Sequence, residues 1–359
     1  MKNKKFKAFL LRFLTNKKKV NFDIKKSKSV LILKYDRIGD MVVTTPIFRE
    51  LKKAFPEISI SVLASESNKD VIRYNPYVDK IYTNYKNRII RDLPTLFRLR
   101  KKHFDVCIEL EHSVIPHAIV RLKIINPKKI ISIHKDGRYG VKGSEIKLYD
   151  YFTDKDKDSH FGQIWLDTLS FFDFKPNSTK YDFFLSQVEI EKASKFVNNF
   201  VNKIKIGINV HGSFPEKSIS NRELEEICFG LKNISSKIQI IILAAPNHFF
   251  EKKDFVSKLR LEYVTSSYPT TTINDAAALI QKLDMVISPD TSIVHIAGCF
   301  DIPTISIHEN NKDSYRLWSP TSSLSKTIFA KSSYGIVNYS ISDVVKYANT
   351  FIQIIESKK

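Results

Sequence analysis

The sequence predicts an α/β protein built from two Rossmann-like domains, each with a parallel sheet covered by helices. Three observations predict this fold class. The 359 residues are too many for one typical domain and suit two, each able to bury its own core. Short β-branched runs alternate with segments of helical periodicity from Val30 onwards, which is the pattern of βαβ units. The alternation begins again near residue 205, so we expect a domain boundary between residues 185 and 203.

The first domain is predicted from five apolar runs that have the length of strands. They cover residues 30–34, 59–65, 80–83, 105–110 and 129–133. A helix is expected over 46–55, because its apolar side chains recur on one face, Pro46 suits a first helical position and Pro56 ends the helix. Another amphipathic helix is expected around 164–172, after a polar stretch.

The second domain is predicted from a similar series. Strands are expected at 205–210, 238–245, 285–288 and 304–307, with helices near 222–231 and 274–283 and from about 292. A linking helix over 189–201 precedes them, and a last amphipathic helix over 342–355 closes the chain or crosses back onto the first half. The expected division is a basic N-terminal segment, two Rossmann-like domains and a C-terminal helix, over residues 1–28, 29–187, 188–340 and 341–359.

The charge balance restricts the possible partners. Lys and Arg number 58 against 38 Asp and Glu, a net charge of +20 at pH 7. This favours phosphorylated small molecules, nucleic acid or an acidic membrane face. No motif combines basic and aromatic residues in the way nucleic-acid-binding proteins do, so no nucleic-acid partner is expected. The distant, apolar-flanked Cys107, Cys228 and Cys299 indicate reduced core residues in a cytoplasmic protein.

The first 19 residues hold eight Lys or Arg and no acidic residue. Apolar side chains recur in them at helical spacing, at Phe6, Phe9, Leu10, Phe13 and Leu14. A helix of this kind can lie on an anionic membrane, although it is too short to span one. A disordered basic leader, or a helix docked on its own domain, explains the pattern equally well. The expected location is the cytoplasm, with peripheral attachment to the inner membrane as an open alternative.

The first chemically rich loop is RIGD, residues 37–40, directly after the apolar run 30–33. It lacks the GxGxxG pattern of dinucleotide-binding sites, which disfavours a nicotinamide or flavin enzyme. Asp40 follows the strand and can act as general base toward a hydroxyl. The alternative is a helix cap, for which Thr44 and Thr45 are better placed.

The second loop is NVHGSFPEKSIS, residues 209–220, after another predicted strand. Gly212 and Ser213 offer backbone N–H groups and a hydroxyl, and Lys217 adds a cation that suits a phosphate. A solvated lysine in a Gly/Ser loop is the commoner explanation of this pattern.

The third loop lies in SPDTSIVHIAGCFDIP, residues 288–303. It places Asp290, Thr291 and Ser292 at the start of a helix, where free N–H groups and partial positive charge favour a diphosphate. Asp290 taken alone is better explained as a helix cap. His295, one turn further, contacts a ligand or belongs to the core, and spacing does not distinguish the two.

These loops together resemble the ADP-heptose:lipopolysaccharide heptosyltransferases of glycosyltransferase family 9. The run RIGDMVVTTPIFRELKKAFP resembles the family's opening loop and helix. NVHGS with its following lysine is a second match, and TTINDAAALIQKLDMVISPDTSIVHIAGCFDIPTISI is a third. The matches occur in order from about residue 30 to 307, which makes the joint signal specific.

The resemblance implies a GT-B fold in which two Rossmann-like domains face a central cleft, the first holding mainly the acceptor and the second the nucleotide-sugar. It also implies an inverting, metal-independent transfer without a cofactor. The default donor is ADP-heptose, and the default acceptor is a lipopolysaccharide or lipooligosaccharide core at the inner membrane face.

Roles for single residues follow from the same resemblance. Asp40 would take the proton from the acceptor hydroxyl, and Lys217 with Thr291 and Ser292 would stabilise the departing diphosphate. Asp290 would hold sugar hydroxyls. Matching positions near the nucleotide or sugar are Ser213 and His295, and candidates on the acceptor side are Arg37, His112 and Ser113.

Two departures from the family pattern concern the donor. Ser292 stands where the family commonly has glycine, and IHENNKDSYRLWSP replaces the usual Gly-Pro-Thr after the last strand. Another nucleotide-sugar for a different surface glycan therefore stays open, as does a non-catalytic nucleotide-binding protein. A metal-dependent transferase would need the three aspartates Asp154, Asp156 and Asp158, but interleaved lysines favour a solvated loop.

Overall fold

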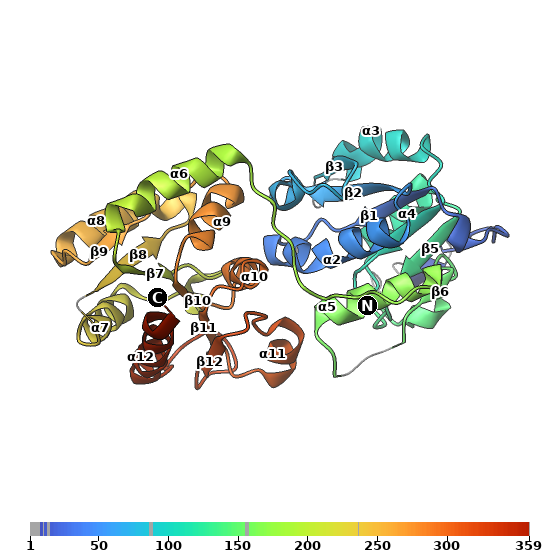
Figure 1. The fold of residues 1–359 in the computed structure, drawn as a ribbon. Helices are drawn as coiled ribbons and strands as arrows, with labels where there is room; N and C mark the ends of the chain where they lie inside the picture. Colours follow the sequence, from blue (N-terminus) through green and yellow to red (C-terminus); the bar gives the residue numbers. More distant parts are fainter. Residues whose placement is uncertain are drawn as a thin grey trace. The chain divides into compact units, whose positions relative to one another are not determined.

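The fold was obtained as a computed structural model that describes residues 8–9, 11–12, 15–85, 89–154, 158–235 and 237–358, without the side chain of residue 89. The chain divides into two compact units, Met1–Thr179 and Lys180–Lys359. Each unit contains one six-stranded sheet in which all strand pairs are parallel (Figure 1). The predicted class of two α/β halves with parallel sheets is confirmed.

Unit 1 has the strand order β3-β2-β1-β4-β5-β6. Its strands are β1 Ser29–Leu33, β2 Ser59–Ser65, β3 Lys80–Asn84, β4 Val106–Glu109, β5 Lys129–Ser132 and β6 Tyr151–Phe152. Its α-helices include α2 Ile38–Ala54, α3 Ile89–Arg100, α4 Pro116–Ile125 and α5 Phe161–Leu166. Helices α3 and α4 pack on each other, and so do α2 and α5.

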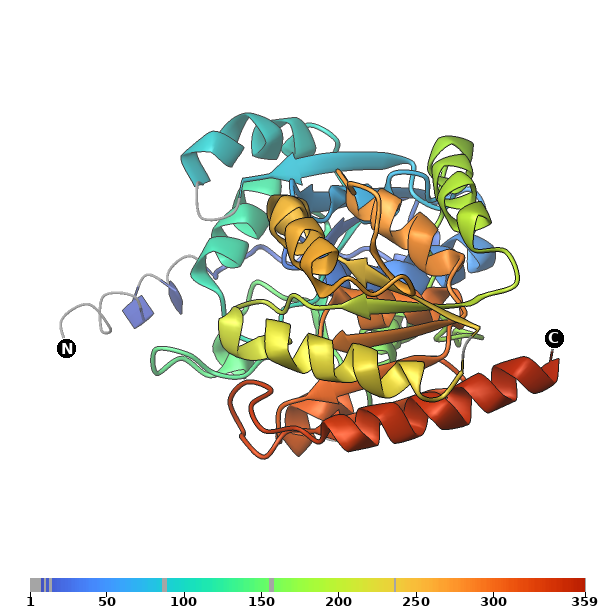
Figure 2. The same cartoon turned by 90° about the vertical axis from the view of Figure 1, so that its left-hand side faces the viewer.

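Unit 2 has the order β12-β11-β10-β7-β8-β9. Its strands are β7 Ile204–Asn209, β8 Ile238–Leu243, β9 Val264–Ser266, β10 Met285–Pro289, β11 Thr304–His308 and β12 Ser325–Phe329. Its α-helices are α6 Gln187–Val197, α7 Asn221–Lys232, α8 Phe249–Leu259, α9 Ile273–Gln281, α10 Ser292–Cys299, α11 Lys312–Trp318 and α12 Ile341–Lys358. The last helix, α12, lies beside α7 (Figure 2), so it packs within its own unit.

Both sheets therefore share the topology 3-2-1-4-5-6, counted from the first strand of each unit. In such sheets the strands before strand 4 are added on one side of strand 1 and the later strands on the other, and ligands bind beyond the carboxyl ends of strands 1 and 4, where this order reverses. The expected ligand positions are the ends of β1 and β4 in unit 1 and of β7 and β10 in unit 2.

Helix α2 begins at Ile38, which corrects the prediction that it begins at Pro46. Pro46 lies inside the helix, where it has no N–H to donate to the carbonyl of Val42. The hydroxyl of Thr45 donates to that carbonyl at 2.7 Å instead. The hydroxyl of Thr44 likewise donates to the carbonyl of Asp40 at 2.7 Å, so neither threonine is an N-cap.

The division between the units falls before the predicted range of 185–203. The segment that follows Thr179 already packs on unit 2, because the ring of Tyr181 contacts His295 and the ring of Phe183 contacts Phe300. The helices α3, α4, α8 and α11 and the strands β6, β9 and β12 were not predicted individually.

The apolar core of unit 1 includes part of the N-terminal segment. Ala8 and Leu11 are buried in one cluster with Leu96 and Leu99 of α3. This favours a docked helix for these two residues. The predicted apolar positions Phe6, Leu10, Phe13 and Leu14 lie outside the described residues.

The three cysteines are buried and unpaired with one another, as predicted. Burial raises the pKa of all three thiols, that of Cys228 to about 12. Across the described residues, no helix combines the length and apolarity needed to cross a membrane.

Candidate active site

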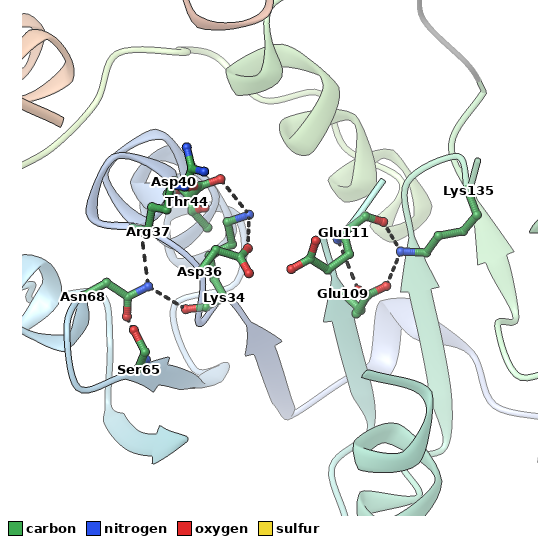
Figure 3. Close-up of polar contacts among 10 residues, drawn as sticks. All are labelled: Lys34, Asp36, Arg37, Asp40, Thr44, Ser65, Asn68, Glu109, Glu111 and Lys135. Atoms are coloured by element: carbon green, nitrogen blue, oxygen red, sulfur yellow. Dashed lines mark hydrogen bonds and ion pairs between the residues drawn. The ribbon is translucent and has the colours of Figure 1, made fainter. Parts of the chain in front are cut away.

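A buried lysine, Lys34, organises the end of β1 in unit 1 (Figure 3). It is 3% exposed although it carries an ammonium group. Its Nζ lies 2.9 Å from Oδ2 of Asp36 and 3.5 Å from Oδ1 of Asp40. The same nitrogen lies 4.0 Å above the ring of Trp165, a residue of α5. Lys34 thus fixes the carboxylate that the sequence indicates as general base.

The carboxyl group of Glu111, just beyond β4, belongs to the same cluster. Burial, followed by a hydrogen bond and charge repulsion from Asp36, raises the pKa of Glu111 to about 9. Glu111 is therefore protonated at neutral pH. Burial acts to lower the pKa of Lys34, but Asp36, Asp40 and Glu111 outweigh it, and the pKa lies above its ordinary value. The cluster therefore holds one cation, Lys34, and one neutral carboxylic acid, Glu111, beside the carboxyl groups of Asp36 and Asp40.

A second buried pair lies beneath Glu111. The ammonium of Lys135 is bound to the carboxylate of Glu109 and to the backbone carbonyl of Glu111. Burial lowers the pKa of Lys135, while its contact with Glu109 opposes that shift. The loop after β4 is thereby tied to β5 by buried polar contacts.

Asn68 holds the loop that carries Asp40. Its amide nitrogen donates to the carbonyl of Lys34 at 3.2 Å and to that of Arg37 at 3.4 Å. Its amide oxygen accepts from the backbone N–H of Ser65 at 2.8 Å, at the end of β2. This buried residue was missed by the sequence analysis, although a polar side chain soon after a strand was a usable signal.

The structure brings the weaker acceptor-side candidates to the same edge of the sheet. Arg37 is exposed and is the N-cap residue of α2, placing Asp40 in the helix's first turn. His112 and Ser113 follow Glu111, and the ring of His112 lies 5.9 Å from that of Phe161. The backbone carbonyl of His112 accepts from the N–H of Asp136 at 2.7 Å.

The equivalent edge of unit 2 is organised by the neutral side chain of Asn209, at the end of β7. Its amide nitrogen donates to Oγ of Ser288 at 2.9 Å and to Oγ1 of Thr291 at 3.1 Å. Thr291 is the N-cap of α10, and its hydroxyl accepts from the N–H of Ile293 at 3.3 Å. The cap is thus Thr291 and not Asp290, and Ser292 is the first residue of the helix.

The loop after β7 folds tightly on itself. The N–H of Gly212 donates to Oγ of Ser218 at 2.9 Å, which corrects the expectation that this group is available to a ligand. A Cβ at Gly212 would lie 2.0 Å from the carbonyl oxygen of Lys217, so only glycine fits. Ser213 is exposed beside it.

Lys217 is not a solvated lysine, because its Nζ lies 2.9 Å from Oε2 of Glu309. Both side chains are mostly buried. Glu309 comes from the segment after β11 that departs from the family pattern. Asp290 lies nearby, with Oδ2 3.8 Å from Nδ1 of His308. Burial lowers the pKa of His308 to about 4, so this histidine is neutral at neutral pH.

His295 is buried in unit 2 between aromatic residues. Its ring lies 6.3 Å from that of Tyr181 and 5.8 Å from that of Trp318. These contacts favour the core explanation over direct ligand contact.

Of the three aspartates Asp154, Asp156 and Asp158, Asp156 lies outside the described residues. Within the described part of the chain, no group of three or more His, Cys, Asp or Glu side chains is arranged to hold a metal ion.

Comparison with known proteins identifies the family of the chain. The model of glycosyltransferase family 9 (heptosyltransferase) matches residues 96–333, more than half of the chain. The putative lipopolysaccharide heptosyltransferase 4 of Escherichia coli strain K12 is 23% identical over 334 residues, covering 86% of this chain and 87% of that protein.

Two solved structures share the fold. A family 9 glycosyl transferase from Veillonella parvula DSM 2008 has a TM-score of 0.75 at 16% identity, covering 94% of this chain and 99% of that one. The ADP-heptose lipopolysaccharide heptosyltransferase II of E. coli has a TM-score of 0.70 at 16% identity, covering 91% and 99%. These likenesses confirm the fold class.

Proposed function

The chain belongs to glycosyltransferase family 9 and is a glycosyltransferase, and on this premise we propose that it transfers heptose from ADP-heptose onto a lipopolysaccharide or lipooligosaccharide core. The proposed reaction is inverting and needs neither a metal ion nor a cofactor. The observation that carries the proposal is the carboxylate of Asp40, held 3.5 Å from the buried ammonium of Lys34 at the end of β1.

In the proposed mechanism Asp40 accepts the proton of the acceptor hydroxyl as that oxygen attacks the anomeric carbon. The bond between the anomeric carbon and the diphosphate breaks, and its electron pair leaves with the diphosphate. Lys34 orients the carboxylate of Asp40 through the contact between the two side chains. Protonation of Glu111 leaves the charge of Lys34 available to the two aspartates.

Unit 2 is proposed to hold the nucleotide-sugar. The N-terminus of α10, with Thr291 and Ser292, offers N–H groups and partial positive charge to a diphosphate. Lys217 would exchange its contact with Glu309 for a contact with the phosphate oxygens. Asp290 is proposed to bind sugar hydroxyls, and Ser213 the nucleotide or sugar. The buried ring of His295 is proposed to support the start of α10 from the core.

The proposed acceptor is a glycolipid at the cytoplasmic face of the inner membrane, where the protein would attach peripherally. The net charge of +20 supports this, since both proposed substrates are anionic. The basic N-terminal segment supports it as well.

The test is calorimetric binding of ADP, UDP, GDP and CMP, followed by transfer from the matching nucleotide-sugar in the presence and absence of EDTA. Selective ADP binding, with EDTA-resistant transfer of heptose, is the expected result. Loss of transfer with EDTA would contradict the metal-independent mechanism.

A different nucleotide-sugar is the second candidate, favoured by Glu309 and Ser292 at positions that depart from the family pattern. Preference for UDP, GDP or CMP would support it. Binding without transfer from any donor would instead support a non-catalytic nucleotide-binding protein.

A further inference from the structure

We propose that helix α3 of unit 1 is a membrane-docking surface that holds the protein on an anionic bilayer. The surface, here called the α3 face, consists of Ile90, Arg91, Pro94, Phe97, Arg98 and Lys101, all exposed. It names the surface for the peripheral attachment proposed above and rests on the proposed function only for the identity of the acceptor.

The α3 face is the outward side of an amphipathic helix. Asp92, Leu96 and Leu99 lie on the inward side and are buried. Ile90 and Phe97, two turns apart, lie on the opposite side, and they are 83% and 52% exposed. The inward side of α3 is therefore packed on the core. The outward side also carries apolar residues, and no segment that the structure describes covers them.

The charged residues of α3 are also divided between its inward and outward sides. Asp92 is the one acidic residue of the helix, and its carboxylate is ion-paired inside the protein with the buried guanidinium of Arg121. The outward residues Arg91 and Arg98, and Lys101 directly after the helix, are all cations. The α3 face thus offers apolar side chains between positive charges and no compensating carboxylate of its own.

An exposed aromatic residue extends this surface. The guanidinium of Arg91 lies 5.5 Å from the ring of Tyr85, which is also exposed. Aromatic rings with a polar end are favoured at the level of lipid headgroups.

The shape and charge of the α3 face suit a bilayer better than a protein. A single helix of 12 residues is about 18 Å long and convex, whereas a standard protein interface buries about 800 Å² per partner. Interfacial helices insert such isolated apolar residues among the headgroups, while their cations pair with anionic lipids.

The experiment measures co-sedimentation of the full chain with vesicles of phosphatidylcholine alone or mixed with anionic phosphatidylglycerol, without sugar substrates. Wild type is expected to bind the anionic vesicles and to be released by salt. Arg91→Gln/Arg98→Gln should lower the partition coefficient roughly 25-fold, because each cation near an anionic surface contributes a factor of about five. Ile90→Ser/Phe97→Ser should lower it to a similar extent.

Matched controls come from unit 2. Phe250 is 80% exposed on α8, next to acidic residues, and Arg222 is exposed on α7. Phe250→Ser and Arg222→Gln should bind vesicles as wild type does. Because all substituted side chains are exposed, the midpoint of thermal unfolding should not change.

Three results would overturn the proposal: wild type does not bind anionic vesicles, α3 variants bind as wild type does, or the control variants lose binding equally. The first would leave a protein partner as the occupant of the α3 face. A chain that binds vesicles but transfers no sugar would contradict only the proposed function.

Discussion

The two units share a strand order but place different chemistry at the same topological position. At the ends of β1 and β4, unit 1 has a buried ammonium, Lys34, among the carboxyl groups of Asp36, Asp40 and Glu111. At the ends of β7 and β10, unit 2 has the neutral groups of Asn209 and Thr291. In the proposed mechanism the first arrangement moves a proton and the second binds an anion. The shared topology places both arrangements at the same position in their sheets, and the side chains there decide the chemistry that is proposed for each.

The variant with the largest expected effect tests whether unit 1 alone supplies the group that accepts the proton. Asp40→Asn should lower kcat by about 10²- to 10⁴-fold, the range for removal of a general base, with ADP affinity unchanged. Asp290→Asn, the matched variant in unit 2, should mainly raise KM for the donor. Steady-state kinetics gives kcat and KM, and calorimetry gives ADP affinity. A loss of kcat in Asp290→Asn but not in Asp40→Asn would assign proton transfer to unit 2 instead of unit 1.

Anion binding by unit 2 is tested by Lys217→Ala. ADP affinity should fall roughly 10- to 100-fold, because a charged hydrogen bond contributes about 1.5–3 kcal/mol. Arg222→Ala, which removes an exposed cation from the same unit, should leave ADP affinity unchanged. Equal ADP affinity of Lys217→Ala and wild type would remove Lys217 from the donor site.

The pH dependence of stability should distinguish the units. The pKa of Glu111 is raised in the folded protein to about 9, so the folded state binds more protons than the unfolded state between pH 5 and 9. The free energy of unfolding of unit 1 should therefore fall as pH rises through this window, by at most about 1.4 kcal/mol per pH unit. Glu111→Gln should flatten the slope.

Each unit carries one of the two tryptophans, Trp165 in unit 1 and Trp318 in unit 2. Urea unfolding followed by fluorescence in a Trp318→Phe background therefore reports on unit 1. Glu226→Gln, an exposed control in unit 2, should leave the slope intact. An unchanged slope in Glu111→Gln would assign the pH dependence to other groups.

A smaller effect separates capping from ligand binding in unit 2. Thr291→Ala should cost about 1 kcal/mol of stability through the lost N-cap of α10, and it should also weaken ADP binding. Thr272→Ala removes the N-cap of α9 and should cost a similar amount while ADP binding stays unchanged. Equal ADP affinity in both variants would mean that the start of α10 is only structural.

The smallest expected effect concerns the Lys217–Glu309 ion pair. Glu309→Gln frees Lys217 and should tighten ADP binding by at most about fivefold, since partly exposed pairs contribute up to about 1 kcal/mol. The gain should disappear in Glu309→Gln/Lys217→Ala. Weaker ADP binding in Glu309→Gln would indicate that Glu309 itself contacts the donor.

The sequence predicted the fold class because strand runs and helical periodicity are local signals, and both units contain the predicted parallel sheet. It misplaced the start of α2, because Pro46 is a strong start signal and the compensating hydroxyl of Thr45 becomes visible only in the folded helix. It indicated Asp40, but it missed Lys34, which contacts Asp40, and Glu111, which interacts with Asp36 and Lys34 in the same cluster. Lys34 and Glu111 are far apart in sequence, and each is an ordinary charged residue until burial and mutual contact change its chemistry.

The burial of Cys107, Cys228 and Cys299 has a practical consequence for labelling. The chain has no other cysteine, and the raised pKa values keep these thiols protonated and slow to react with maleimides. A cysteine placed on the surface would therefore be the one reactive thiol of the native protein. An environment-sensitive fluorophore attached through Phe97→Cys would report on the α3 face without background from the native thiols.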